Sequence, residues 1–187
     1  MKTFKSIALL AVIMVMSCGK GASKQTANAK GFTAIETEIK SKFGDNAYYT
    51  ELTISYNKSI GNSISVIATE SPESLKMGEW YLTLDTWKQN SEITLEVPQG
   101  SKASEFMFQL DDNINLTQLG ELVEKSSDLI KAESSSENPT LYMAYIKLPK
   151  NGDLSKTEYI VLLNSEDGEN TYTFIYKLND QLIQMDY

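Results

Sequence analysis

The stretch from Phe32 to Tyr56 reads FTAIETEIKSKFGDNAYYTELTISY, and it decides the fold class of the chain. Its first half predicts a helix with one buried face, because apolar side chains recur at steps of three and four: Phe32, Ile35, Ile39 and Phe43. Thr33 and Glu36 match the capping-box pattern that begins a helix, and Gly44 is typical of a helix end. The second half alternates with a period of two, which indicates a half-buried antiparallel strand.

The same alternation continues along the first half of the chain. It predicts further strands near residues 63–68, 80–87 and 92–97, with turns at 60–62 and 88–91. On this reading residues 80–87 form one unbroken strand. The apolar triplet at 106–108 is expected to be either an edge strand or a loop packed on the core.

The second half of the chain repeats this order of elements. A longer amphipathic helix is expected to begin at Asn115 or Thr117, from the apolar positions Leu116, Leu119, Leu122, Val123, Leu129 and Ile130. Strands follow at 140–148, 158–164, 170–177 and 181–187, with hairpin signals at Asn151-Gly152 and Asp167-Gly168. We therefore expect an α+β fold of two consecutive helix-plus-four-strand halves, residues 31–110 and 111–187, in one domain. Both helices should cover one face of an antiparallel sheet.

A duplication is one explanation of this repeat, since Leu52 and Tyr56 lie 89 residues before Leu141 and Tyr145. The alternative is two unrelated halves with similar spacing. In element order the chain is similar to the β-lactamase-inhibitor-protein fold and to PepSY-type modules. No motif accompanies that resemblance, so it implies nothing about function.

The composition of the 187 residues argues against most catalytic chemistry. The chain has no His, no Arg and a single Cys, and its net charge is -8. These absences remove the commonest general base, the bidentate phosphate clamp and an internal disulfide. The acidic balance argues against nucleic acid as a partner. We expect no catalytic residue, no metal site and no cofactor.

The N-terminus has the pattern of an exported protein. Lys2 and Lys5 precede an apolar run that is too short to span a bilayer. The run ends in Val15-Met16-Ser17-Cys18, which resembles the lipobox of bacterial lipoproteins. That resemblance implies removal of residues 1–17 and a lipid anchor on Cys18. Because Gly19 is not the Asp of the inner-membrane retention pattern, it also implies an outer-membrane lipoprotein that faces the periplasm. The alternative is an ordinary signal peptide with a coincidental cysteine.

Residues 18–30 are small and polar, with no periodicity. They predict a flexible tether of roughly 40 Å when extended, from which the domain hangs near the membrane without lying on it.

The strand pattern also predicts an uncovered sheet face. Trp80 and Trp87 lie seven residues apart, so on an unbroken strand they face opposite sides, with Trp80 in the core and Trp87 exposed. Large aromatic and acidic side chains on a polar face are typical of a recognition surface. The candidate interaction residues are Tyr49, Glu51, Tyr81, Asp85 and Trp87.

The second half of the chain is expected to be apolar on both sheet faces, as at Leu141 to Leu148 and at Tyr159 to Leu163. A sheet that is apolar on both faces must be covered on both. The sequence therefore predicts a protein partner or self-association. The leading hypothesis is a non-catalytic interaction module, such as an inhibitor, an immunity protein or an assembly factor. The alternatives are a carrier of a small apolar ligand held between helices and sheet, and an enzyme.

Overall fold

The computed structural model describes residues 21–133 and 138–186. Within this part of the chain there are two α-helices, α1 (Ala29–Phe43) and α2 (Leu116–Glu133). The eight strands are β1 (Tyr48–Asn57), β2 (Gly61–Thr69), β3 (Lys76–Thr83), β4 (Thr86–Thr94), β5 (Thr140–Lys147), β6 (Glu158–Asn164), β7 (Thr171–Lys177) and β8 (Leu182–Asp186). Short 3-10 helices interrupt this order at η1 (Ala22–Lys24), η2 (Pro72–Ser74), η3 (Ala103–Phe106) and η4 (Leu154–Lys156).

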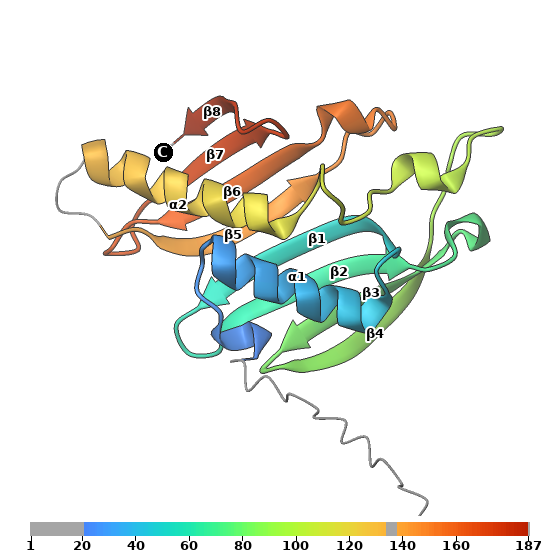
Figure 1. Ribbon diagram of the computed structural model, residues 1–187, viewed down its shortest axis with the longest axis horizontal. Helices are drawn as coiled ribbons and strands as arrows, with labels where there is room; N and C mark the ends of the chain where they lie inside the picture. Colours follow the sequence, from blue (N-terminus) through green and yellow to red (C-terminus); the bar gives the residue numbers. More distant parts are fainter. Residues whose placement is uncertain (1–20, 134–137, 187) are drawn as a thin grey trace, which may run out of the picture.

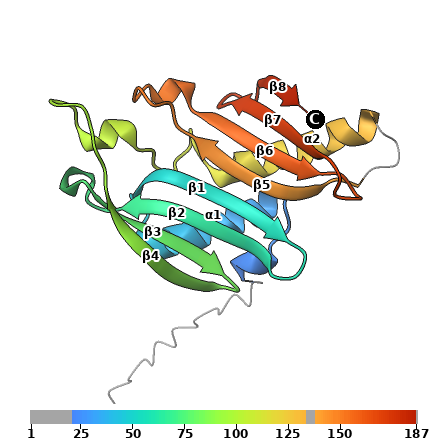
Figure 2. The ribbon, with the colours of Figure 1, turned by 180° about the vertical axis from the view of Figure 1, so that it is seen from behind.

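All eight strands form one antiparallel sheet in the order β4-β3-β2-β1-β5-β6-β7-β8. The first strands of the two halves, β1 and β5, therefore pair at its centre. Figure 1 shows both helices in front of the sheet, α1 over β1–β4 and α2 over β5–β7, and Figure 2 shows the opposite face with both helices behind it. The expected class, helices with an antiparallel sheet, is confirmed.

Helix α1 begins earlier than the sequence predicts. Its N-cap is Asn28, whose side chain accepts a hydrogen bond from the amide of Gly31 (2.9 Å). The predicted capping box is wrong, because the Thr33 hydroxyl lies one turn inside the helix and donates to the carbonyl of Ala29 (2.8 Å). Gly44 ends the helix with a positive φ of 89°.

The two helices lie side by side and run in opposite directions. The Ala29 amide donates to Glu124 of α2 (3.1 Å), and the Leu116 amide donates to Glu36 of α1 (2.7 Å). Glu36 thus supplies a negative charge at the N-terminus of α2, where it is favourable. Asn115, one of the two starts that the sequence predicts, caps α2 by accepting from the Gln118 amide (2.8 Å). A Cβ at Gly120 would lie 2.6 Å from the Asn28 carbonyl oxygen, so glycine permits the close approach.

The expected strand at 80–87 is instead a hairpin. β3 ends at Thr83, the chain turns at Leu84-Asp85, and β4 returns with Leu82 opposite Trp87. Both turn residues have positive φ, 50° and 59°. The turn expected at 88–91 therefore lies inside β4.

The second half follows the sequence more closely, with strand limits within a residue or two of those expected at 140–177. The triplet 106–108 is a packed loop: Met107 and Phe108 are buried, and Phe108 bridges to Tyr49. Met107 belongs to a small second core on the far face of the sheet, with Met77 and Ala103.

The tether prediction is wrong for residues 21–30, because η1 (Ala22–Lys24) packs on the sheet and α1 begins at Ala29. Ala22 and Ser23 are buried, and the side-chain amide of the buried Asn62 donates to the carbonyls of Ala22 (3.1 Å) and Gln25 (2.8 Å). The Ser23 amide donates to Asp85 (2.8 Å). Satisfying the backbone groups in this way removes the freedom of a tether.

Candidate interaction surface

The face of the sheet turned away from the helices is called the outer face here (Figure 2). Strand pairing defines one row of directly opposed residues across all eight strands of this face, and paired residues point to the same side. This central row consists of Lys88, Tyr81, Ser65, Thr53, Tyr145, Ile160, Ile175 and Gln184. Its β4–β1 part is polar apart from the Tyr81 ring, whereas its β5–β7 part is aromatic and aliphatic.

In the first half, Glu79 organises the outer face. Its carboxylate accepts hydrogen bonds from Ser91 (2.6 Å), Asn90 (2.8 Å) and Tyr81 (2.8 Å). These donors lower the pKa of Glu79, and the bond to Glu79 raises the pKa of the Tyr81 phenol. The Tyr81 side chain is therefore held by a polar network at the water-exposed surface.

In the second half, the outer face is apolar around Tyr145. Met143 and Leu162 are paired neighbours, and so are Tyr145 and Ile160. Ile160 is only 2% exposed although no helix covers this side, and Tyr142 is 45% exposed. An open hollow of about 410 Å³ lies between β1 and β5 and is lined by outer-face residues such as Glu51, Thr53, Met143, Tyr145 and Lys147.

The five candidate residues from the sequence do not form one surface. Glu51 and Tyr81 lie on the outer face and are exposed, and Asp85 is at the tip of the β3–β4 turn, bonded to the Ser23 amide. Tyr49 and Trp87, by contrast, pack on the helix side against Phe43, with ring centroids 6.4 Å and 5.0 Å from it.

Each of these two corrections has a physical cause. A bulge between Tyr49 and Glu51 reverses the side on which Tyr49 lies relative to the simple alternation. Tyr49 is 1% exposed, and burial together with the nearby charge of Glu36 raises the pKa of its phenol. For Trp87 the cause is the hairpin, which returns the ring to the side of Trp80, where its indole donates to Glu38 (2.9 Å). Neither side chain belongs to an exposed recognition surface.

Sequence reasoning detected the apolar character of the second half but did not single out Tyr145 or Ile160. The apolar character is visible in the sequence because both the odd and the even positions of β5 and β6 carry apolar residues. Another bulge, between Leu141 and Met143, turns Leu141, Ala144 and Ile146 toward the helices and leaves Met143 and Tyr145 on the outer face.

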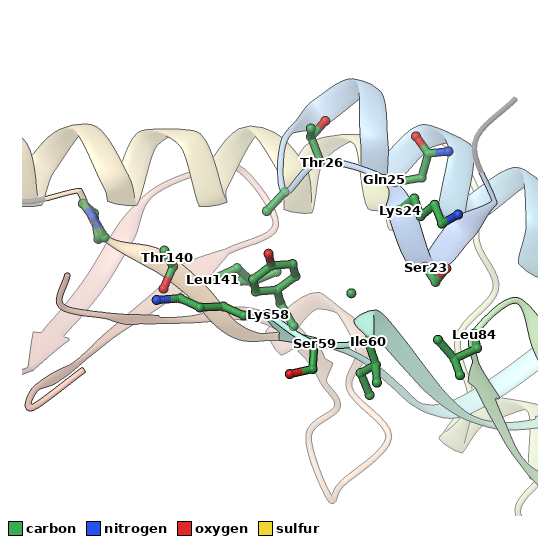
Figure 3. Close-up of a pocket in the computed structure, with 14 residues that line it drawn as sticks. Ser23, Lys24, Gln25, Thr26, Lys58, Ser59, Ile60, Leu84, Thr140 and Leu141 are labelled. Atoms are coloured by element: carbon green, nitrogen blue, oxygen red, sulfur yellow. The ribbon is translucent and has the colours of Figure 1, made fainter. Parts of the chain in front are cut away.

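A larger hollow, of about 600 Å³, opens at the end of the sheet beside the N-terminal segment (Figure 3). Residues 23–27 form one wall, the β1–β2 turn and Leu84 form another, and Thr140 and Leu141 of β5 complete it. Tyr56, Ile60 and Leu84 in its lining are all exposed large apolar side chains, and Leu84 is the most exposed, at 63%. Among the described residues, the charged side chains in the lining are Lys24 and Lys58.

Among the residues that the structure describes, no group of three or more His, Cys, Asp or Glu side chains is placed to hold a metal ion. In the same ranges, neither helix is long and apolar enough to cross a membrane. Cys18 and the expected signal peptide lie outside the described residues. No protein-family model matches the chain, and comparison with curated proteins and with solved structures finds no match.

Proposed function

We propose that the chain is a non-catalytic protein-interaction module, anchored in the outer membrane by lipid on Cys18 and facing the periplasm. It binds a partner protein, or a second copy of itself, through the apolar part of the outer face on β5–β7. This places the binding surface in the second half, around Tyr145, rather than at the five residues that the sequence singled out.

The observation that supports this proposal is the apolar side of the central row. Tyr145 and Ile175 are half-buried on either side of the buried Ile160, on a face that no helix covers, and the half-buried Met143 and Leu162 continue the patch one row away. Contiguous apolar patches on a polar sheet are typical of protein interfaces, and aromatic residues often anchor them. The surrounding charges, such as the Lys147–Glu158 pair (2.8 Å), would form a polar rim.

We further propose that the two halves derive from one helix-plus-four-strand unit. The first strand of each half carries a bulge at the same place, after Tyr49 in β1 and after Leu141 in β5. This alignment makes Thr53 equivalent to Tyr145, and these two residues pair at the centre of the sheet. Through the pairing, Ser65 is then equivalent to Ile160, and Tyr81 to Ile175.

The alignment supplies a matched experiment. Tyr145→Thr places on β5 the residue found at the equivalent position of β1, and Tyr81→Thr makes the same change on the polar side. Pull-downs from detergent-solubilised membranes should recover a partner with the wild-type chain and with Tyr81→Thr. The Tyr145→Thr variant should lose it, since a truncated anchor at an interface commonly costs about 2 kcal/mol or more. Equal recovery by both variants, or no partner in any growth state, would refute the proposed surface.

The lipid anchor has a separate test. The mass of the mature chain should correspond to a polypeptide that begins at Cys18 and carries acyl chains, and a Cys18→Ser variant should not be processed. An unmodified Cys18 in the wild-type chain would remove the anchor from the proposal without affecting the interaction surface.

A carrier of a small apolar ligand is a second candidate function. The space between helices and sheet, where the sequence places such a ligand, is filled by the main core, which includes Phe32, Leu52 and Phe174. The 600 Å³ hollow of Figure 3 is the feature that favours this function, because Tyr56, Ile60 and Leu84 line it. Native mass spectrometry of the chain from its host should then show bound lipid mass, and a ligand-free mass would refute the carrier function.

A further inference from the structure

Four charged side chains form a row across the outer face, directly beside the central row, and this row is called the charge row here. Lys147 on β5 pairs with Glu158 on β6, and Glu158 pairs with Lys177 on β7. Glu51 on β1 completes the row, because the pairing of β1 with β5 places it beside Lys147, and both line the hollow of about 410 Å³. The signs therefore alternate across β1, β5, β6 and β7, and they sum to zero in a chain whose net charge is -8.

A row of four alternating charges is complementary to its own reverse. A two-fold axis parallel to the strands, midway between β5 and β6, lays the outer faces of two copies on each other with the charge row reversed. β5 then lies over β6 of the second copy, and β1 lies over β7. Lys147 meets Glu158 of the second copy, Glu51 meets Lys177, and no two like charges of the row are opposed. Each contact occurs twice, as a symmetric dimer requires.

The same rotation lays the apolar rows on each other. Tyr145 lies over Ile160 of the second copy, and Met143 lies over Leu162. Two sheets that stack face to face lie about 10 Å apart, with the side chains of both inner faces between them. The second copy thus covers the apolar part of the outer face, which no helix covers within one chain.

The remaining groups on the outer face do not oppose this arrangement. Asp186 on β8 lies in the same row as Ser63 on β2, so it meets this neutral side chain in the second copy. β3 and β4 lie beyond β8 of the second copy, outside the overlap. The segment with Ala103 and Met107 packs on the outer face at Met77 of β3, away from β5–β7 (Figure 2).

We propose that the occupant of the apolar outer face is a second copy of this chain, in a symmetric face-to-face dimer centred between β5 and β6. This inference rests on the proposed function, because it uses the same surface and narrows the partner to the chain itself. The apolar rows supply the affinity. The charge row fixes the register and the direction of the two sheets, since shifting one sheet by one strand would oppose like charges.

Glu51 and Lys177 provide a test that a contact within one chain cannot imitate. In one chain they are separated by β5 and β6, which is three strand spacings or about 14 Å. That distance exceeds the screening length of about 8 Å at physiological ionic strength. Glu51→Lys and Lys177→Glu should each oppose two pairs of like charges in the dimer and weaken it roughly tenfold or more. Mixed in equal amounts, the two variants should form a one-to-one heterodimer, because each altered side chain then meets an opposite charge.

Sedimentation equilibrium of the mature chain, purified from membranes in density-matched detergent, measures the dissociation constants. Native mass spectrometry with one variant labelled with nitrogen-15 identifies the heterodimer. Lys88→Glu is the matched control, because it makes the same charge change at an exposed position of the outer face on β4, outside the overlap. This control should dimerise like the wild type.

A wild-type chain that stays monomeric throughout the titration overturns the dimer. The pull-downs with Tyr145→Thr and Tyr81→Thr then decide the proposed surface separately, since a different protein that is lost only with Tyr145→Thr keeps that surface. A dimer that both charge variants leave intact, or that mixing them does not restore, is formed by another surface and also overturns the inference.

Discussion

The two halves of the sheet share a strand plan but differ on the outer face. Ser65 and Ile160 occupy equivalent places in the central row, and so do Tyr81 and Ile175. In the first half the equivalent positions are polar or tied into the Glu79 network, whereas in the second half they are aliphatic. The comparison teaches that the backbone pattern and the surface chemistry are separable: the bulge of β1 recurs in β5, while the side chains on the outer face differ.

The halves also differ in the number of buried tyrosines whose pKa is raised, one in the first half and two in the second. We expect the largest effect on stability when these tyrosines ionise at alkaline pH. Burial raises the pKa of Tyr49 in the first half and of Tyr159 and Tyr176 in the second, above the ordinary value of 10.0. The three phenols therefore stay protonated to a higher pH in the folded chain than in the unfolded chain. The stability is therefore intact below pH 10 and falls as the pH rises above it, by at most about 1.4 kcal/mol per pH unit for each tyrosine.

Denaturant titrations at increasing pH check this loss, with tyrosinate absorbance as the second readout. Tyr176→Phe should reduce the slope, because it removes one of the phenols whose pKa is raised by burial. A stability that is flat between pH 10 and 11 would show that these phenols ionise in the folded state as readily as in the unfolded one.

The next largest effect is expected when a side chain of the central row is truncated, because the loss of unfolding free energy should differ between the two halves. Ile160→Ala should cost about 2–5 kcal/mol of unfolding free energy, because the side chain is 2% exposed and its removal leaves a cavity. Ser65→Ala, at the equivalent place, should change the stability by about 0.5 kcal/mol or less. Urea unfolding of both variants provides the measurement, and comparable losses would contradict the asymmetry of the outer face.

Removing the hydroxyl of a single buried tyrosine should change the stability less, and the direction of the change should differ between Tyr159 and Tyr49. The Tyr159 hydroxyl accepts from the Asn115 amide (2.9 Å) and bonds the Asn115 carbonyl and Gln118 (3.2 Å each). Tyr159→Phe should therefore cost about 1–2 kcal/mol. The Tyr49 hydroxyl is buried and has no hydrogen-bond partner among the described residues. Tyr49→Phe should be neutral or stabilising, and thermal unfolding of the pair checks the signs. A substantial loss in Tyr49→Phe would mean that this hydroxyl has a partner in solution.

The second half was the more predictable half because its turns carry recognisable chemistry. Asp167-Gly168 marks the β6–β7 turn, and Gly168 has the positive φ (78°) that such a turn requires. In the first half, Leu84-Asp85 forms a two-residue turn in which both residues have positive φ without Asn or Gly, so the sequence alternates through it as an unbroken strand would. Counting alternate residues along the strands places Trp87 and Tyr49 on the wrong face of the sheet. The β3–β4 hairpin changes the side of Trp87, and the bulge after Tyr49 changes the side of Tyr49, and neither feature has a sequence signature.

The surface was harder to predict than the fold. Apolar residues at odd and even positions of β5 and β6 indicate that the second face of the sheet is also buried or bound. Which residues lie on that face depends on the bulge after Leu141. The N-terminal segment has the small polar residues of a linker, so its sequence predicts a flexible tether and not a packed segment. Its packing depends on Asn62, a residue far along the chain whose side chain bonds the backbone of that segment.

Photo-crosslinking in living cells tests the central claim most directly. A benzoyl-phenylalanine placed at Tyr145 or at Tyr81 keeps an aromatic ring at each position, on opposite halves of the same row. We predict a discrete crosslinked protein, either a partner or a second copy of this chain, from position 145 and none from position 81. A crosslink that forms only from position 81, or equally from both, would contradict the assignment of the interaction to the second half.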